Sequence, residues 1–199
     1  MIIVDMESSG LDPYKHSLLS VGAVEFEKPE NQFYEECQMW EGAHVDARAL
    51  EINGFTFDQI HDPAKKSENN LLNNFIFWAE SCGELTIAGQ NPSTDRDFLR
   101  AAALRYHTNW SFAFRVVDLH SVAYLHMKER GIDPPVVNKH SALNLDTILK
   151  YVGMPEEPKP HNGLRGAKLE AEAFSRLFYS KLLFREYSKY PIPFKIIEL

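Results

Sequence analysis

Asp5 and Glu7 are two carboxylates, separated by one residue, at the end of an apolar segment (2–6) that is typical of a buried strand. Side chains two residues apart on a strand point to the same face, so the spacing places both carboxylates side by side. Adjacent carboxylates repel each other unless a cation lies between them, and hard oxygen ligands suit Mg²⁺ or Mn²⁺. The pair indicates a divalent-metal site; the alternative is a pair of solvated charges at a strand end.

Two later segments contain residues that could work with this pair. Asp95 opens a predicted helix after a short strand at 85–88, a position where the helix dipole favours an acid for structural reasons alone. His161 precedes the last long helix, and a histidine titrates near neutrality, as a general base must. Taken singly, Asp95 is explained as a helix-terminal acid and His161 as a surface-loop histidine.

Taken in order, the three segments resemble the three exonuclease motifs of the DEDDh family, the 3′→5′ exonucleases of the ribonuclease-H-like superfamily. The segments are Asp5-Met6-Glu7-Ser8-Ser9-Gly10-Leu11, then Asn91-x3-Asp95-x2-Phe98-Leu99, then His161-x2-Leu164. The resemblance extends from residue 1 to about residue 183. It implies a metal-dependent 3′→5′ exonuclease that releases 5′-mononucleotides from single-stranded DNA, RNA or short oligonucleotides.

The resemblance also implies roles for individual residues. Two divalent cations, Mg²⁺ or Mn²⁺, would lie roughly 4 Å apart and hold the scissile phosphate. Asp5 would bridge both ions, Glu7 would hold one of them, and Asp95 would support the site. His161 would take a proton from the attacking water.

The residues that the resemblance assigns to substrate binding are Met6, Leu11 and Asn91. The backbone around Met6 and the side chain of Leu11 would contact the terminal nucleotide. Because apolar packing reads no base sequence, we expect little base preference. RNA differs from DNA by a 2′-hydroxyl, and the residue that would contact this group cannot be located from the sequence. Both RNA and DNA are therefore kept as candidate substrates.

The chain departs from the family pattern at Gly166. The family has an aspartate five residues after the histidine, and that aspartate ligates the same ion as the counterpart of Glu7. At 100° per residue, Glu170 falls inside the apolar stripe of the last helix, whereas Glu172 falls on the opposite, solvent side. A buried acid needs a partner. We therefore predict that Glu170 replaces the missing aspartate as a metal ligand; the alternative is that it pairs with an Arg or Lys.

Two functions follow from this departure. The first is an active exonuclease, which the retained Asp5, Glu7, Asp95 and His161 favour. The second is a catalytically weakened relative that binds nucleic acid ends or a partner without efficient cleavage, which only Gly166 favours.

The surrounding pattern predicts the elements that must position these residues. Three early strands and two later ones alternate with helices, which indicates an α/β fold with a mixed five-stranded sheet flanked by helices. The predicted strands are 2–6, 18–26, 32–40, 85–88 and 115–119. The predicted helices are 46–53, 70–81, 95–106, 120–130, 142–152 and 167–184. We expect one exonuclease-like domain over 1–199, with the motifs in 1–183 and a tail at 184–199. The short apolar part of this tail, 190–194, is expected to dock on the body or on a second subunit.

Composition limits the remaining possibilities. No run of 18 apolar residues is present, so no membrane partner is expected, and the start lacks the pattern of a signal peptide. Cys37 and Cys82 are too few for a disulfide framework and lack the spacing of a zinc site, which favours reduced thiols and the cytoplasm. Five aromatic residues, Phe75, Phe77, Trp78, Phe112 and Phe114, are predicted to lie in the core rather than to stack on bases.

The net charge of −7 excludes a protein that coats duplex nucleic acid by bulk electrostatics. The charge is uneven, however. Residues 1–95 contain 5 Lys and Arg against 17 Asp and Glu, whereas residues 96–199 contain 16 against 11. We therefore expect an acidic metal pocket beside a modest basic rim, suited to a single-stranded 3′ end. Family members of this size are homodimers, so a homodimer is expected by analogy.

Overall fold

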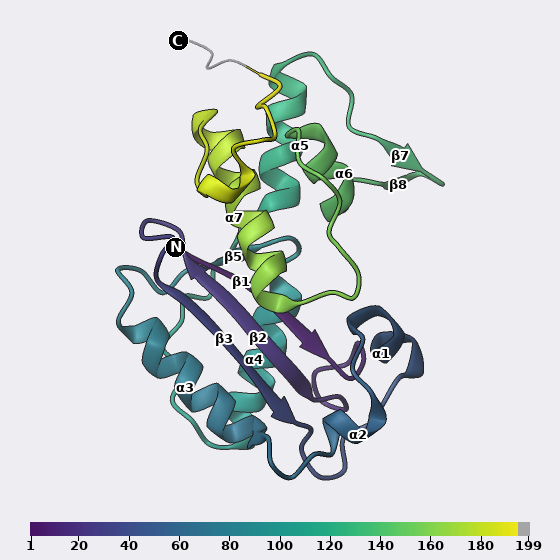
Figure 1. Ribbon diagram of the computed structural model, residues 1–199, viewed down its shortest axis with the longest axis vertical. Helices are drawn as coiled ribbons and strands as arrows, with labels where there is room; N and C mark the ends of the chain where they lie inside the picture. Colours follow the sequence, from purple (N-terminus) through teal and green to yellow (C-terminus); the bar gives the residue numbers. More distant parts are fainter. Residues whose placement is uncertain (195–199) are drawn as a thin grey trace.

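One mixed β-sheet organises residues 1–194, the part of the chain that the computed structural model describes (Figure 1). Its strands are β1 (Ile2–Ser8), β2 (Leu18–Glu25), β3 (Gln32–Gln38), β4 (Lys66–Ser67), β5 (Ile87–Gly89) and β6 (Val117–Asp118). They lie in the order β4-β3-β2-β1-β5-β6, with β1 antiparallel to β2 and parallel to β5. The prediction of five strands was short by one, because a strand of two residues shows no alternation of apolar and polar side chains.

The helices follow the predicted order with shifted ends. They are α1 (Ala47–Asn53), α2 (Phe57–Ile60), α3 (Glu68–Glu80), α4 (Ser93–Arg105), α5 (Leu119–Glu129), α6 (Leu145–Tyr151), α7 (Gly163–Tyr179) and the 3₁₀ helix η1 (Arg185–Tyr187). The short α2 was not predicted, nor was a separate hairpin of β7 (Val136–Val137) and β8 (His140–Ser141), which projects to the side in Figure 1.

Helix α7 begins earlier and ends earlier than the sequence predicted. The Asn162 side chain caps its first turn by accepting a hydrogen bond from the Arg165 N–H (3.1 Å). Ser180 ends it in the left-handed conformation, with φ 49°. The two glycines of the first turn, Gly163 and Gly166, hid this start because glycine is a weak helix former.

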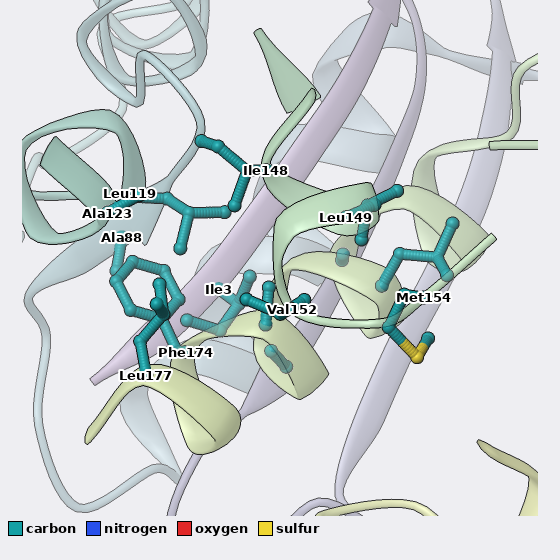
Figure 2. Packing of buried hydrophobic residues seen from close by; sticks show 14 of the residues in the cluster. Ile3, Ala88, Leu119, Ala123, Ile148, Leu149, Val152, Met154, Phe174 and Leu177 are labelled. Atoms are coloured by element: carbon teal, nitrogen blue, oxygen red, sulfur yellow. The ribbon is translucent and has the colours of Figure 1, made fainter. Parts of the chain in front are cut away.

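The two faces of β1 bury different side chains. Ile2 and Val4 pack into a cluster with residues of α3 and α4. Ile3 packs on the opposite face with Phe174 of α7 and apolar residues of α5 and α6 (Figure 2). Asp5 lies two residues after Ile3, so the alternation along the strand turns its side chain toward α7.

The start of α7 crosses the sheet at backbone contact. A Cβ atom on Gly163 would lie 2.5 Å from the carbonyl oxygen of Asp5, and a Cβ on Gly22 of β2 would overlap the backbone of Gly163 and Leu164. Only glycine at both positions allows this approach. The crossing brings the loop before α7 and its first turns directly over the carboxylates of β1.

The prediction that Glu172 faces solvent was wrong. Glu172 and Arg176 are both 0% exposed and form an ion pair of 2.7 Å between Oε1 and Nε. The backbone N–H groups of Leu183 and Phe184 also donate to Glu172 Oε2, each at 2.9 Å. The segment after α7 folds back over the helix, so the face opposite the apolar stripe is buried as well.

The predictions for the aromatic residues were correct only in part. Phe75 and Phe112 are buried, but Phe77 and Phe114 are exposed and were wrongly placed in the core. Cys37 and Cys82 are free thiols. The described part of the tail docks on the body, where the Phe194 ring packs against the rings of His126 and Tyr151; positions 195–199 lie outside the described residues. None of the helices in residues 1–194 combines the length and the apolar character that a membrane span needs.

Candidate active site

The acids of the first two sequence segments meet at the end of β1. Asp5 and Glu7 lie on this strand, and Asp95 lies in the first turn of α4. The Asp95 Oδ1 accepts a hydrogen bond of 3.0 Å from the backbone N–H of Met6, the residue between the two β1 acids. The structure therefore joins segments that are 89 residues apart in the chain.

Helix α7 presents Gly166 and Glu170 to the same strand end. The Asp5 Oδ2 occupies the space where a side chain at position 166 would begin. Glu170 is 3% exposed, as its helical position predicted. Its Oε2 would lie 2.8 Å from a Cβ atom on Gly89, so the absence of a side chain there makes room for the carboxylate.

His161 reaches the site from the loop between α6 and α7. Its backbone N–H donates to the carbonyl of Ile52 (3.3 Å), which ties the loop to α1. Its Nδ1 lies 3.7 Å from Oε2 of Glu157, and the imidazole stays 32% exposed while the Glu157 side chain is only 6% exposed. The sequence reasoning missed Glu157, since it lies in a proline-rich loop (155–160) where no periodicity indicates which side chains point inward.

A cavity of about 280 Å³ opens among these groups. Its walls include Asp5, Gln90, Asp146, Glu157, His161 and Glu170. Four acidic residues and a histidine thus border one space that small ligands can enter.

The carboxyl groups have strongly perturbed proton affinities. Burial raises the pKa of Glu7 to about 8, with the charges of Glu157 and Asp95 adding to the effect. Burial likewise raises the pKa of Asp95 to about 7, against the hydrogen bond from Met6. Burial, and then the charges of neighbouring acids, also raises the pKa values of Asp5 and Glu170. Burial raises the pKa of Glu157 as well, against the charges of His161 and Arg165. Five acids in one place form a site that favours a cation.

Two unpartnered oxygens show that the residues fit a divalent ion. Glu157 Oε1 and Glu170 Oε2 are buried and have no hydrogen-bond partner. The available ligands are carboxylate oxygens, which suit Mg²⁺ and Mn²⁺. Within residues 1–194, no three His, Cys, Asp or Glu side chains lie close enough together to coordinate one metal ion. Metal binding would therefore draw the carboxylates closer.

The residues predicted to bind substrate lie around this strand end in different settings. The Leu11 side chain is 85% exposed in the turn after β1. Met6 is half-buried beneath its bond to Asp95. Asn91 uses its polar groups locally, donating from its backbone to Asp118 (3.2 Å) and from its side chain to Thr94 (2.9 Å). Leu11 and Asn91 are thus exposed, whereas Met6 is partly covered.

Comparison with solved structures places this arrangement in a known fold. The nuclease domain of 3′hExo, a DEDDh family member solved with bound rAMP, superposes with a TM-score of 0.70, covering 98% of this chain and 96% of that domain at 17% identity. The chain has the fold of a DEDDh nuclease domain. A zinc-bound complex of E. coli exonuclease I with single-stranded DNA gives a TM-score of 0.69 at 19% identity, over 90% of this chain and 40% of that one.

Sequence comparison agrees over a shorter stretch. Ribonuclease T of Haemophilus influenzae (strain PittGG) is 28% identical over 119 residues, which cover 52% of this chain. The match spans about half of that ribonuclease's own length, 51%. No family model matches the sequence. The α/β, ribonuclease-H-like fold is confirmed by the solved structures, and the activity is considered next.

Proposed function

We propose that the chain is a DEDDh-family 3′→5′ exonuclease, which hydrolyses single-stranded DNA, RNA or short oligonucleotides to 5′-mononucleotides in the presence of a divalent metal. The observation that carries the proposal is the convergence of Asp5, Glu7, Asp95 and Glu170 with His161 at one strand end. These groups come from four separate parts of the chain: β1, α4, the loop before α7, and α7 itself. A structural role alone does not require so many buried acids to face each other.

Each residue has a role that its position supports. Asp5, Glu7 and Asp95 would hold two divalent ions, Mg²⁺ or Mn²⁺, with Glu170 as a further ligand. Bound ions supply charge stabilisation for the attacking and the leaving oxygen of the phosphodiester. Asp95 also fixes the backbone at Met6 through its 3.0 Å hydrogen bond, which positions Asp5 and Glu7 on either side. His161, still accessible in its loop, would accept the proton of the attacking water.

The substrate class follows from the exposed residues and from the relatives. Leu11 offers an apolar surface beside the acids, on which a terminal base can pack without sequence preference. The structural relatives were solved with rAMP and with single-stranded DNA, so both sugar types are included in the proposal. A cytoplasmic location, based on the free thiols Cys37 and Cys82, and a homodimer, based on analogy, stay predictions.

The test is a 3′-shortening assay on a 5′-labelled single-stranded oligonucleotide with Mg²⁺ or Mn²⁺. We expect stepwise shortening that stops with a chelator and in Asp5→Ala. Asp133→Ala is the matched control, since Asp133 is 92% exposed and pairs with Lys128 on the surface; it should cleave like the unmodified chain. Binding of the oligonucleotide without shortening would refute the proposal and indicate the weakened, binding-only relative.

A further inference from the structure

We propose that Glu157, in the loop before α7, is a further ligand of the divalent-metal site and makes up for the carboxylate that Gly166 lacks. This inference rests on the proposed function, since it concerns the metal site of that function. It assigns the missing ligand to a loop residue nine positions upstream of the glycine, rather than to a residue further along α7.

Burial and an unpartnered oxygen carry the first step. The Glu157 side chain is 6% exposed, and its Oε1 has no hydrogen-bond partner. Its Oε2 faces the His161 Nδ1 at 3.7 Å, beyond hydrogen-bond distance. A buried carboxylate oxygen without a partner, as Glu157 Oε1 is, is costly unless a cation or a donor reaches it.

The position of Glu157 in the cluster carries the second step. Glu157 and Asp5 both line the cavity of about 280 Å³. Glu170 and His161 line the same cavity. Glu157 therefore borders the space in which Asp5 and Glu170 would hold an ion.

The loop holds Glu157 in place, as a metal ligand requires. Its backbone N–H donates to Asp146 Oδ1 in the first turn of α6 (3.0 Å). The Arg165 guanidinium donates to the carbonyls of Pro158 (2.9 Å) and Pro160, which fastens the loop to the first turn of α7. Both ends of the short segment around Glu157 are thus fixed to helices that border the site.

Titration calorimetry with Mn²⁺ on the full chain tests the proposal. We expect Glu157→Gln to weaken one bound ion at least about tenfold, since even indirect partners of metal ligands cost 10–100-fold in affinity. Glu157→Asp keeps the charge but withdraws it by one methylene, and should weaken the same ion. Glu156→Gln is the matched control: Glu156 is the adjacent acid, it is exposed, and its replacement should leave both ions unchanged.

Thermal unfolding in chelator separates ligation from folding. Glu157→Gln removes no hydrogen bond from Oε1, so it should unfold no lower than the unmodified chain without metal while losing part of the Mn²⁺-induced rise in Tm. Unmodified Mn²⁺ affinity in Glu157→Gln or Glu157→Asp overturns the inference and leaves the exonuclease proposal intact. An unmodified chain that binds no Mn²⁺ and shortens no oligonucleotide overturns both.

Discussion

Replacing Glu172 by leucine should destabilise the protein by at least about 5 kcal/mol. The change leaves the guanidinium of Arg176, which is 0% exposed, without its ion-pair partner at 2.7 Å. Removing one partner of a buried pair costs roughly 3–5 kcal/mol. The N–H groups of Leu183 and Phe184 also lose their acceptor, and each unmade bond costs about 1 kcal/mol or more. At roughly 2–4 °C per kcal/mol for a chain of this size, Tm should fall by about 10–20 °C.

Urea unfolding followed by circular dichroism measures this loss. The control is Glu129→Gln, on an exposed surface of α5, which should change the free energy of unfolding by less than about 0.5 kcal/mol. The double variant Glu172→Leu with Arg176→Met should recover part of the loss, because no unpaired charge then stays buried. A cost below about 1 kcal/mol for Glu172→Leu, or a double variant as unstable as the sum of the two single changes, would refute the reasoning.

Four further predictions concern the site itself. Leu11→Ala should raise KM for a single-stranded oligonucleotide several-fold, because the exposed side chain contacts the substrate. The Mn²⁺ affinity, measured by calorimetry, should stay unchanged. An unchanged KM would show that Leu11 is not part of the substrate site. Mn²⁺ affinity should rise roughly fiftyfold from pH 6 to pH 8, since Glu7, with a pKa of about 8, is only about 1% ionised at pH 6; a flat profile would contradict metal binding through Glu7. Without metal, the stability of the fold should depend on pH in the opposite direction to the metal affinity. Burial raises the pKa values of Glu7 and Asp95, so these groups contribute stability at low pH that is lost as the pH rises through about 7 to 8. This loss is measurable as a Tm that falls with rising pH in the presence of chelator. Gly166→Asp should lower the Tm measured without metal, because the new side chain overlaps Asp5, and should enlarge the rise in Tm that Mn²⁺ induces. Gly166→Ala adds bulk without charge, so it should lower the metal-free Tm but should not enlarge the Mn²⁺-induced rise.

The parts of the site that regular periodicity controls could be predicted from the sequence. The two-residue period of β1 placed Asp5 and Glu7 on one face, and the helical period placed Glu170 inside the protein. Both periods act over a few neighbouring residues, and tertiary contacts did not override them here.

The remaining features depend on contacts between distant segments. The sequence placed Glu172 in solvent because the helical period was interpreted with a single buried face. In the structure, the segment after α7 also covers the opposite face of the helix. Glu157 was missed because the proline-rich loop gives its side chains no regular direction. The early start of α7 was missed because its glycines are needed for contact with Gly22, which no local preference indicates.

The covering of α7 by the segment after it also has a consequence for synthesis on the ribosome. Arg176 donates to the carbonyl of Tyr190 (3.0 Å), and Glu172 accepts from Leu183 and Phe184, so the buried charges of α7 gain these partners only after residue 190 has been made. A shorter nascent chain would leave some of these buried donors and acceptors without their partners, which disfavours the packing of α7. Gly166 and Glu170 reach their final places with that helix, which makes the carboxylate cluster one of the last parts of the molecule to assemble.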